Sequence, residues 1–204
     1  MTELAVSAMS MLSTRADGRA RLREGACIAA MVAAFKPGMD DLILEHIGSA
    51  LGNLANHYAA RQQMRDAGAV GMITRLLRLS HRPRAQVRKA ARARRLHQNE
   101  RRGIHAGLSA AAGVQVAASV ALALAAAKDG AMQDSARYIG AIPSLVDMVA
   151  SYNATVSEVG RLALLALRHR NSRNADEILC CMRSRRCAPP SPPTPRQPRA
   201  TQRI

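Results

Sequence analysis

Apolar residues in this chain recur at helical spacing in short segments that alternate with polar turns. In the segment MITRLLRL, the apolar positions follow an i, i+3, i+4 pattern: Met72, Ile73, Leu76, Leu77 and Leu79. The polar residues Thr74, Arg75 and Arg78 fall on the other side of the same helix. This pattern predicts a helix with one apolar stripe, which is stable only when the stripe packs against a neighbour.

The same pattern repeats along the chain as a turn and an apolar helix, followed by a second helix rich in Ala and Leu. The first type of segment covers residues 23–35, 65–79, 100–111 and 137–151, and the second covers 2–12, 42–57, 85–99, 114–127 and 155–170. A late Leu marks each second segment: Leu12, Leu54, Leu96, Leu124 and Leu167. The intervals of 42, 42, 28 and 43 residues are close to the length of a helical repeat unit, except for the 28, which indicates a damaged copy.

Two of these segments, DAGAVGMITRLLRL and IGAIPSLVDMV, resemble the second helix of armadillo repeats, and EHIGSALGNLA resembles the third. Residues 17–23, 60–65 and 132–136 would then be first helices. The resemblance covers about residues 1–180 and implies an all-α protein, a right-handed α-solenoid of about four armadillo-type repeats whose units share one core. We therefore expect a repeat domain at 1–182, degenerate around 97–113. Its pattern starts and stops inside a unit, which predicts an incomplete stack.

Three glycines mark the predicted turns before the second helices: Gly25, Gly68 and Gly140. At such turns we expect a positive φ or a close backbone approach, both of which favour glycine. Pro143 lies just inside a predicted helix start, where its missing N–H does no harm. Residues 183–204 are rich in Pro and Arg and lack apolar periodicity, so we expect a disordered C-terminal tail.

Armadillo proteins bind extended peptides along a concave groove lined by the third helices, and import adaptors of this family use a Trp and, four residues later, an Asn. In this chain the Trp position is occupied by Ser7, Ser49, Ala91, Ser119 and Leu162, and the Asn position by Met11, Asn53, Arg95, Ala123 and Ala166. Only Asn53 matches. The resemblance therefore makes Asn53 a candidate groove contact and argues against classical recognition of basic import signals. The alternative for Asn53 is a hydrogen bond to a neighbouring turn.

Charge changes this picture, because 30 Lys and Arg residues against 14 Asp and Glu give a formal charge of +16. Between Arg82 and Arg102 the basic residues cluster, and Arg88, Arg92 and Arg95 share one predicted helix face. Like charges at this spacing repel, so an anion would stabilise them. The run predicts either a groove for an acidic peptide or a phosphate contact, with a solvated helix face as the alternative.

The remaining residues give no sign of catalysis. The six His are scattered, no Gly-rich phosphate loop exists, and Cys180, Cys181 and Cys187 do not suit a tetrahedral metal site. We expect no enzyme activity, catalytic residue, metal, cofactor or small-molecule substrate. Aromatic platforms are scarce, with no Trp, so specific nucleic-acid recognition is disfavoured.

The sequence predicts an interaction scaffold that binds an acidic or extended protein segment along a concave, partly basic groove. The alternative is non-specific nucleic-acid binding through residues 82–102. No apolar window suits a membrane span, and neither a secretory signal nor a disulfide framework is evident. We therefore expect an intracellular protein in the cytoplasm, with the nucleus as the alternative.

Overall fold

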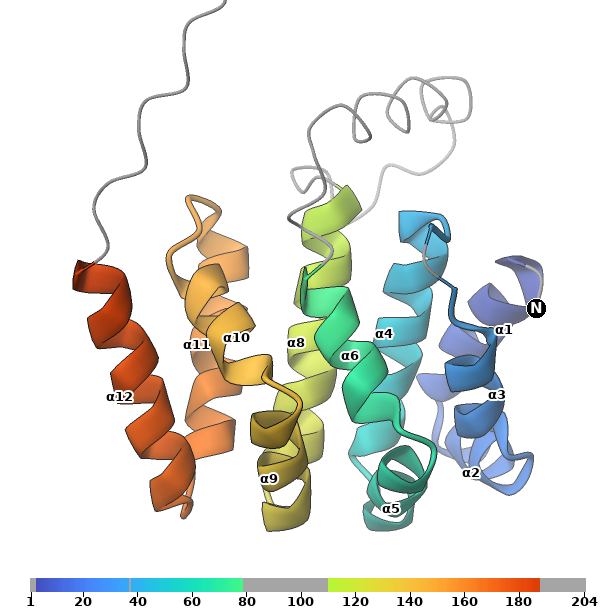
Figure 1. Ribbon diagram of the computed structural model, residues 1–204. Coiled ribbons are helices and arrows are strands. Elements are labelled where there is room, and N and C mark those ends of the chain that lie inside the picture. Colours follow the sequence, from blue (N-terminus) through green and yellow to red (C-terminus); the bar gives the residue numbers. More distant parts are fainter. Residues whose placement is uncertain (1–2, 37, 79–109, 188–204) are drawn as a thin grey trace, which may run out of the picture.

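The structure is a computed structural model that describes residues 3–36, 38–78 and 110–187. Every regular element in these ranges is a helix (Figure 1). In chain order they are α1 (Glu3–Ser13), α2 (Ala16–Glu24), α3 (Cys27–Ala34), α4 (Asp41–Ala55), α5 (Tyr58–Asp66), α6 (Ala69–Arg78), α8 (Ala110–Ala126), α9 (Gly130–Tyr138), α10 (Ala141–Val149), α11 (Ala154–Arg168) and α12 (Ser172–Cys187). The predicted all-α class is confirmed.

The helices form units of three, stacked side by side in two layers (Figure 1). The units are α2-α3-α4, α5-α6-α8 and α9-α10-α11, with α1 before them and α12 after them. The third helices make one continuous layer in which α1 packs on α4, α4 on α8 and α8 on α11. The second helices α3, α6 and α10 make the other layer, and α12 closes against α10 and α11. Stacking lets each unit bury an apolar stripe that it cannot bury alone.

The predicted repeat register is wrong between α4 and α8. We expected a third helix at 85–99 between them, but α8 packs directly on α4, with Gly48 and Gly52 of α4 facing Ala117 and Ala121 of α8. Helix α8 is therefore the third helix of the unit that α5 and α6 begin. Residues 79–109 stand between α6 and α8 of that unit in the sequence. The intervals of 42 residues from Leu54 to Leu96 and of 28 residues from Leu96 to Leu124 therefore belong to one long unit and not to two. Of the predicted degenerate stretch 97–113, residues 110–113 form the first turn of α8, and 97–109 lie outside the described residues.

The turns before the second helices have the expected left-handed backbone at two of the three glycines. Gly68 and Gly140 have φ values of +72° and +77°, as predicted. Gly25 has a φ of −78°, and the next residue, Ala26, carries the positive φ of +52°. At Gly25 the other predicted reason for glycine applies, since a Cβ there would lie 3.3 Å from the main-chain oxygen of Arg21. Pro143 lies in the first turn of α10, where helical N–H groups have no intrahelical partner.

The core is one contiguous apolar cluster that runs through all three units. Ile47, Leu51 and Leu54 of α4 and Leu122 of α8 are fully buried in it. Aliphatic side chains fill the space, with the partly buried Phe35 packed against them, and Ala and Gly on facing helices let the backbones come close. The core therefore fixes the spacing of the third helices.

Buried polar groups connect neighbouring units at one end of the helices. The carboxylate of Asp129 caps α9 by accepting from the N–H of Met132, and it also pairs with the guanidinium groups of Arg61 and Arg65 on α5. The Asn174 amide donates to the main-chain oxygen of Leu167 at 2.9 Å and to that of Gln133 at 3.2 Å. The contacts of Asp129 with α5 and of Asn174 with Gln133 join helices that are far apart in the sequence.

Helix α12 extends to Cys187, past the predicted domain boundary at 182. The rest of the predicted tail, residues 188–204, lies outside the described residues. Within the described ranges, no helix combines the length and the apolar character that a bilayer crossing requires.

Candidate functional site

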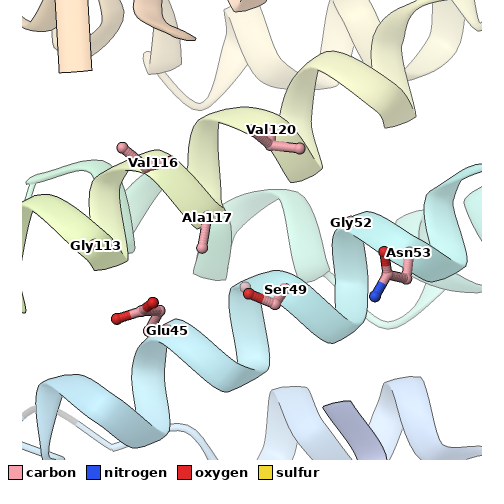
Figure 2. A pocket seen from close by; sticks show the side chains of 9 residues that line it. Glu45, Ser49, Gly52, Asn53, Gly113, Val116, Ala117 and Val120 are labelled. Carbon is pink, nitrogen blue, oxygen red and sulfur yellow. The ribbon is translucent and has the colours of Figure 1, made fainter. Parts of the chain in front are cut away.

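An open pocket of about 190 Å³ lies between the third helices α4 and α8 (Figure 2). Helix α4 lines it with Glu45, Gly48, Ser49, Gly52 and Asn53, and helix α8 lines it with Gly113, Val116, Ala117 and Val120. Figure 2 shows the two helices running alongside each other, with Glu45 toward one end and Asn53 toward the other. The pocket therefore belongs to the layer of third helices on which the sequence placed the groove.

Small residues create this pocket. A Cβ atom at Gly48 would lie 3.0 Å from the Cβ of Ala117, and a Cβ at Gly113 would lie 2.5 Å from Oε2 of Glu45. Both distances are shorter than ordinary van der Waals contact, so glycine lets α4 and α8 approach at these points. Larger side chains there would push the helices apart or fill the cleft. Glu45 and Asn53 lie toward the two ends of the pocket, and between them Ser49 is the polar side chain among Gly, Ala and Val residues.

Asn53 lies where the sequence placed it, on the exposed side of a third helix. Its Nδ2 donates to the hydroxyl oxygen of Ser13 at 3.0 Å, and that hydroxyl donates to the main-chain oxygen of Ser10 at 2.6 Å. The amide therefore links α4 to the last turn of α1 while it also lines the pocket. A contact of Asn53 with a bound partner stays a prediction.

Helix α8 presents different residues to the groove from those that the sequence alignment assigned. Ser119 is fully buried, and its hydroxyl lies 3.3 Å from Sδ of Met148. The next residue, Val120, is 39% exposed and lines the pocket. The groove position predicted at Ser119 is therefore occupied by Val120. The alignment was one residue off in this helix because it treated Leu124 as the buried marker, whereas Leu122 and Ala125 are the fully buried residues.

The described surface of the third helices is apolar with few charges. Met11 is 71% exposed, and Leu162 and Leu165 are each 51% exposed. Glu158 and Arg161 form an exposed ion pair of 2.9 Å on α11. Arg88, Arg92 and Arg95, the predicted basic face, lie outside the described residues, as does Ala91. The predicted basic character of the groove therefore depends on those arginines.

The described residues contain no group of three His, Cys, Asp or Glu side chains that could hold a metal ion. Cys27, Cys180 and Cys181 are free thiols. Burial, aided by the nearby carboxylate of Glu177, raises the pKa of the Cys181 thiol. A raised pKa makes this cysteine a poorer nucleophile, since the thiolate is the reactive form.

Comparisons with known proteins support the fold. Neither a protein-family model nor a curated protein sequence matches the chain. Among solved structures, two engineered proteins match 88% of the chain with TM-scores of 0.66 and 0.67 at 16% and 17% identity. A designed armadillo repeat protein in complex with the peptide (KR)4 also matches 88% of the chain, with a TM-score of 0.62 at 15% identity.

The chain spans about three fifths of the length of these structures, covering 61% of the first and 62% of the other two. At such identities the likeness establishes the fold alone. It agrees with the stacked three-helix units and their continuous layer of third helices. The chain therefore has an armadillo-type repeat fold, a right-handed α-solenoid as its sequence predicted.

Proposed function

We propose that this chain is a protein-interaction scaffold that binds an extended protein segment along the surface formed by α1, α4, α8 and α11. The observation that carries the proposal is the pocket between α4 and α8, which opens on this surface beside Asn53. The designed armadillo protein with a similar fold is a complex with a peptide, which supports the same use of the fold here. The proposal assigns the chain to binding and not to catalysis.

The bound segment is acidic in this proposal, unlike the (KR)4 peptide of the designed protein. A formal charge of +16 raises the local concentration of anionic partners and repels cationic ones. Nine of the Lys and Arg residues lie from Arg82 to Arg102 against Glu100 alone, so this stretch carries +8, half of the formal charge. We assign Arg88, Arg92 and Arg95 to partner contacts on this basis. The free thiols fit a reducing, intracellular compartment.

The test is a selection from a random peptide library on the intact chain, repeated with three variants. Val120→Arg blocks the pocket, Arg88→Glu/Arg92→Glu/Arg95→Glu reverses the basic face, and Tyr138→Arg is the control, since Tyr138 is 90% exposed on α9, outside the third-helix layer. We expect selected peptides to be acidic and to bind the control variant normally. Both other variants should lose at least about tenfold in affinity, which is about 1.4 kcal/mol.

Two outcomes would contradict the proposal. Peptides that bind the Val120→Arg variant as well as the unmodified chain would place the binding surface elsewhere. Binding of a random-sequence oligonucleotide more tightly than any selected peptide, with an affinity that falls steeply with salt, would support the alternative of non-specific polyanion binding through residues 82–102.

A further inference from the structure

We propose that the pocket between α4 and α8 holds one tyrosine side chain of the bound segment. This inference rests on the proposed function, because it names the residue by which the segment is anchored. It depends on three properties of the pocket: its size, its walls of short and mainly apolar side chains, and the carboxylate at one end.

The size of the pocket suits one six-membered ring. Its volume is about 190 Å³. An apolar protein cavity of about 150 Å³ is large enough to bind benzene. The additional space corresponds to the substituent of a phenol ring and the opening through which it enters. A short aliphatic side chain would leave much of this volume without contacts, and unfilled space forfeits dispersion energy.

Between Glu45 and Asn53 the pocket is lined by short side chains. Gly48 and Gly52 of α4 face Ala117 and Ala121 of α8 where the helices meet. Figure 2 shows Ser49 on the α4 side and Val116 and Val120 on the α8 side. A planar ring can contact both faces of such a slot, which is how aromatic side chains bury large areas at little entropic cost. None of the chain's own aromatic residues, Phe35, Tyr58, Tyr138 and Tyr152, lines the pocket. A ring in the slot would therefore come from the partner.

The carboxylate of Glu45 selects a ring that carries a hydrogen-bond donor. A carboxylate offers about four acceptor positions, so it can accept from a ligand in addition to its contacts within the protein. A phenolic O–H that donates to a carboxylate makes a short, strong hydrogen bond. A lysine could also reach this group, but the positive field of the chain opposes a cationic segment. Tyrosine supplies the donor without the charge.

The first experiment uses p-cresol, toluene and n-butylammonium as probes for the tyrosine, phenylalanine and lysine side chains. The full chain carries isotope-labelled valine methyl groups, and each probe is titrated while the methyl resonances of Val116 and Val120 are followed by NMR. We expect p-cresol to shift both resonances and to bind several-fold more tightly than either other probe. In Glu45→Gln, the advantage of p-cresol over toluene should shrink, since a neutral amide oxygen is a weaker acceptor.

A variant that fills the slot provides the control for position. Ser49 lines the pocket and is half-buried, so Ser49→Phe would place a ring of the chain's own in the slot. Ser184→Phe makes the same change on the exposed surface of α12. We expect Ser49→Phe to weaken p-cresol binding by at least about tenfold, or about 1.4 kcal/mol, and Ser184→Phe to leave it unchanged. If Ser49→Phe does not fold, the comparison of probes on the unmodified chain and on Glu45→Gln still decides.

Three results would overturn the inference: n-butylammonium binding more tightly than p-cresol, toluene binding as well as p-cresol, or p-cresol shifting other resonances instead of those of Val116 and Val120. A peptide library with one position fixed separates this failure from that of the proposed function. Peptides that bind through the groove without preferring tyrosine would refute the anchor and leave the scaffold in place. Binding of p-cresol in the slot without binding of any peptide would refute the scaffold instead.

Discussion

Replacing Gln133 by Met tests whether buried amide groups hold the units together. Gln133 lies on α9 and is only 3% exposed. Its Nε2 lies 3.0 Å from the main-chain oxygens of Ala126 and Ala166, and 3.1 Å from that of His169. These carbonyls lie at the C-terminal ends of α8 and α11, where the last C=O groups have no intrahelical partner. The Gln133 amide therefore supplies hydrogen-bond donors to the main-chain oxygens at the C-terminal ends of two adjacent third helices, α8 and α11.

The loss of unfolding free energy can be worked out from the hydrogen bonds that the Gln133 amide makes. The Ala126 oxygen also accepts from the main-chain N–H of Asp129 at 3.3 Å, so loss of the amide leaves the partly buried carbonyls of Ala166 and His169 without this donor. Each unpaired buried group costs about 1–3 kcal/mol. Met has almost the same length and helix propensity as Gln and packs adaptably, so these contributions largely cancel, and its added apolar burial recovers part of the loss. We expect Gln133→Met to destabilise the chain by about 2–4 kcal/mol.

Urea unfolding followed by circular dichroism measures this loss. With a slope of about 2 kcal/mol per M, the midpoint should fall by about 1–2 M. Gln62→Met is the matched control, because Gln62 is exposed on α5 and its oxygen accepts only from the neighbouring Arg65 among the contacts described. Surface changes of this kind stay within about 0.5 kcal/mol. Equal urea midpoints for Gln133→Met and Gln62→Met would show that the hydrogen bonds of the Gln133 amide contribute nothing measurable to stability.

Three other predictions follow from backbone geometry and cysteine chemistry. Ala26→Gly should stabilise the chain by about 0.5–1 kcal/mol, because relief of the left-handed Ala outweighs the greater entropy that Gly gives the unfolded chain; a raised Tm checks this, and an unchanged or lowered Tm contradicts it. Gly18→Ala should destabilise it by about 2 kcal/mol, because the new Cβ would lie 2.1 Å from a main-chain oxygen of α1; a urea midpoint at or above that of the unmodified chain refutes the clash. Iodoacetamide should alkylate Cys181 more slowly than Cys180 at about pH 8, because the raised pKa of Cys181 lowers its thiolate fraction, and the difference between the two rates should narrow toward pH 10. Mass spectrometry of Cys→Ser variants measures both rates, and a rate difference independent of pH would assign the effect to solvent access alone.

Sequence periodicity was sufficient for the fold because each helix carries its own apolar stripe. The segment predicted at 65–79 is observed as α6 at Ala69–Arg78, and the segment predicted at 155–170 as α11 at Ala154–Arg168. The short first helices were placed correctly from the turn glycines Gly68 and Gly140 alone. Local patterns of this kind depend on neighbours within one helix, which the sequence contains.

The register of the units could not be read in the same way. A stretch containing Leu96 has the spacing and composition of a third helix, so it was counted as one. Which helix packs on α4 depends on contacts between Gly48 and Ala117, residues that are far apart in the sequence. Similarly, the shift from Gly25 to Ala26 at the first turn depends on how α3 docks, because an L-residue adopts a positive φ only when packing imposes it.

The candidate site was predictable only in part. Asn53 was found by comparison with a motif, and the structure places it beside the pocket. The small residues that make the pocket, Gly48, Gly52 and Gly113, were not identified as site residues. A signal for them exists, since Gly48 and Gly52 are four residues apart on one helix face and oppose small residues of α8. That pattern has meaning only after the pairing of α4 with α8 is known.

The direct packing of α8 on α4 places an evolutionary constraint on the chain. The two helices meet through Gly48 and Gly52 on one side and Ala117 and Ala121 on the other. A larger side chain at one of these positions would separate the backbones unless the opposite helix changed with it. The four positions should therefore vary together among related sequences, although those of α4 lie more than sixty residues from those of α8 along the chain.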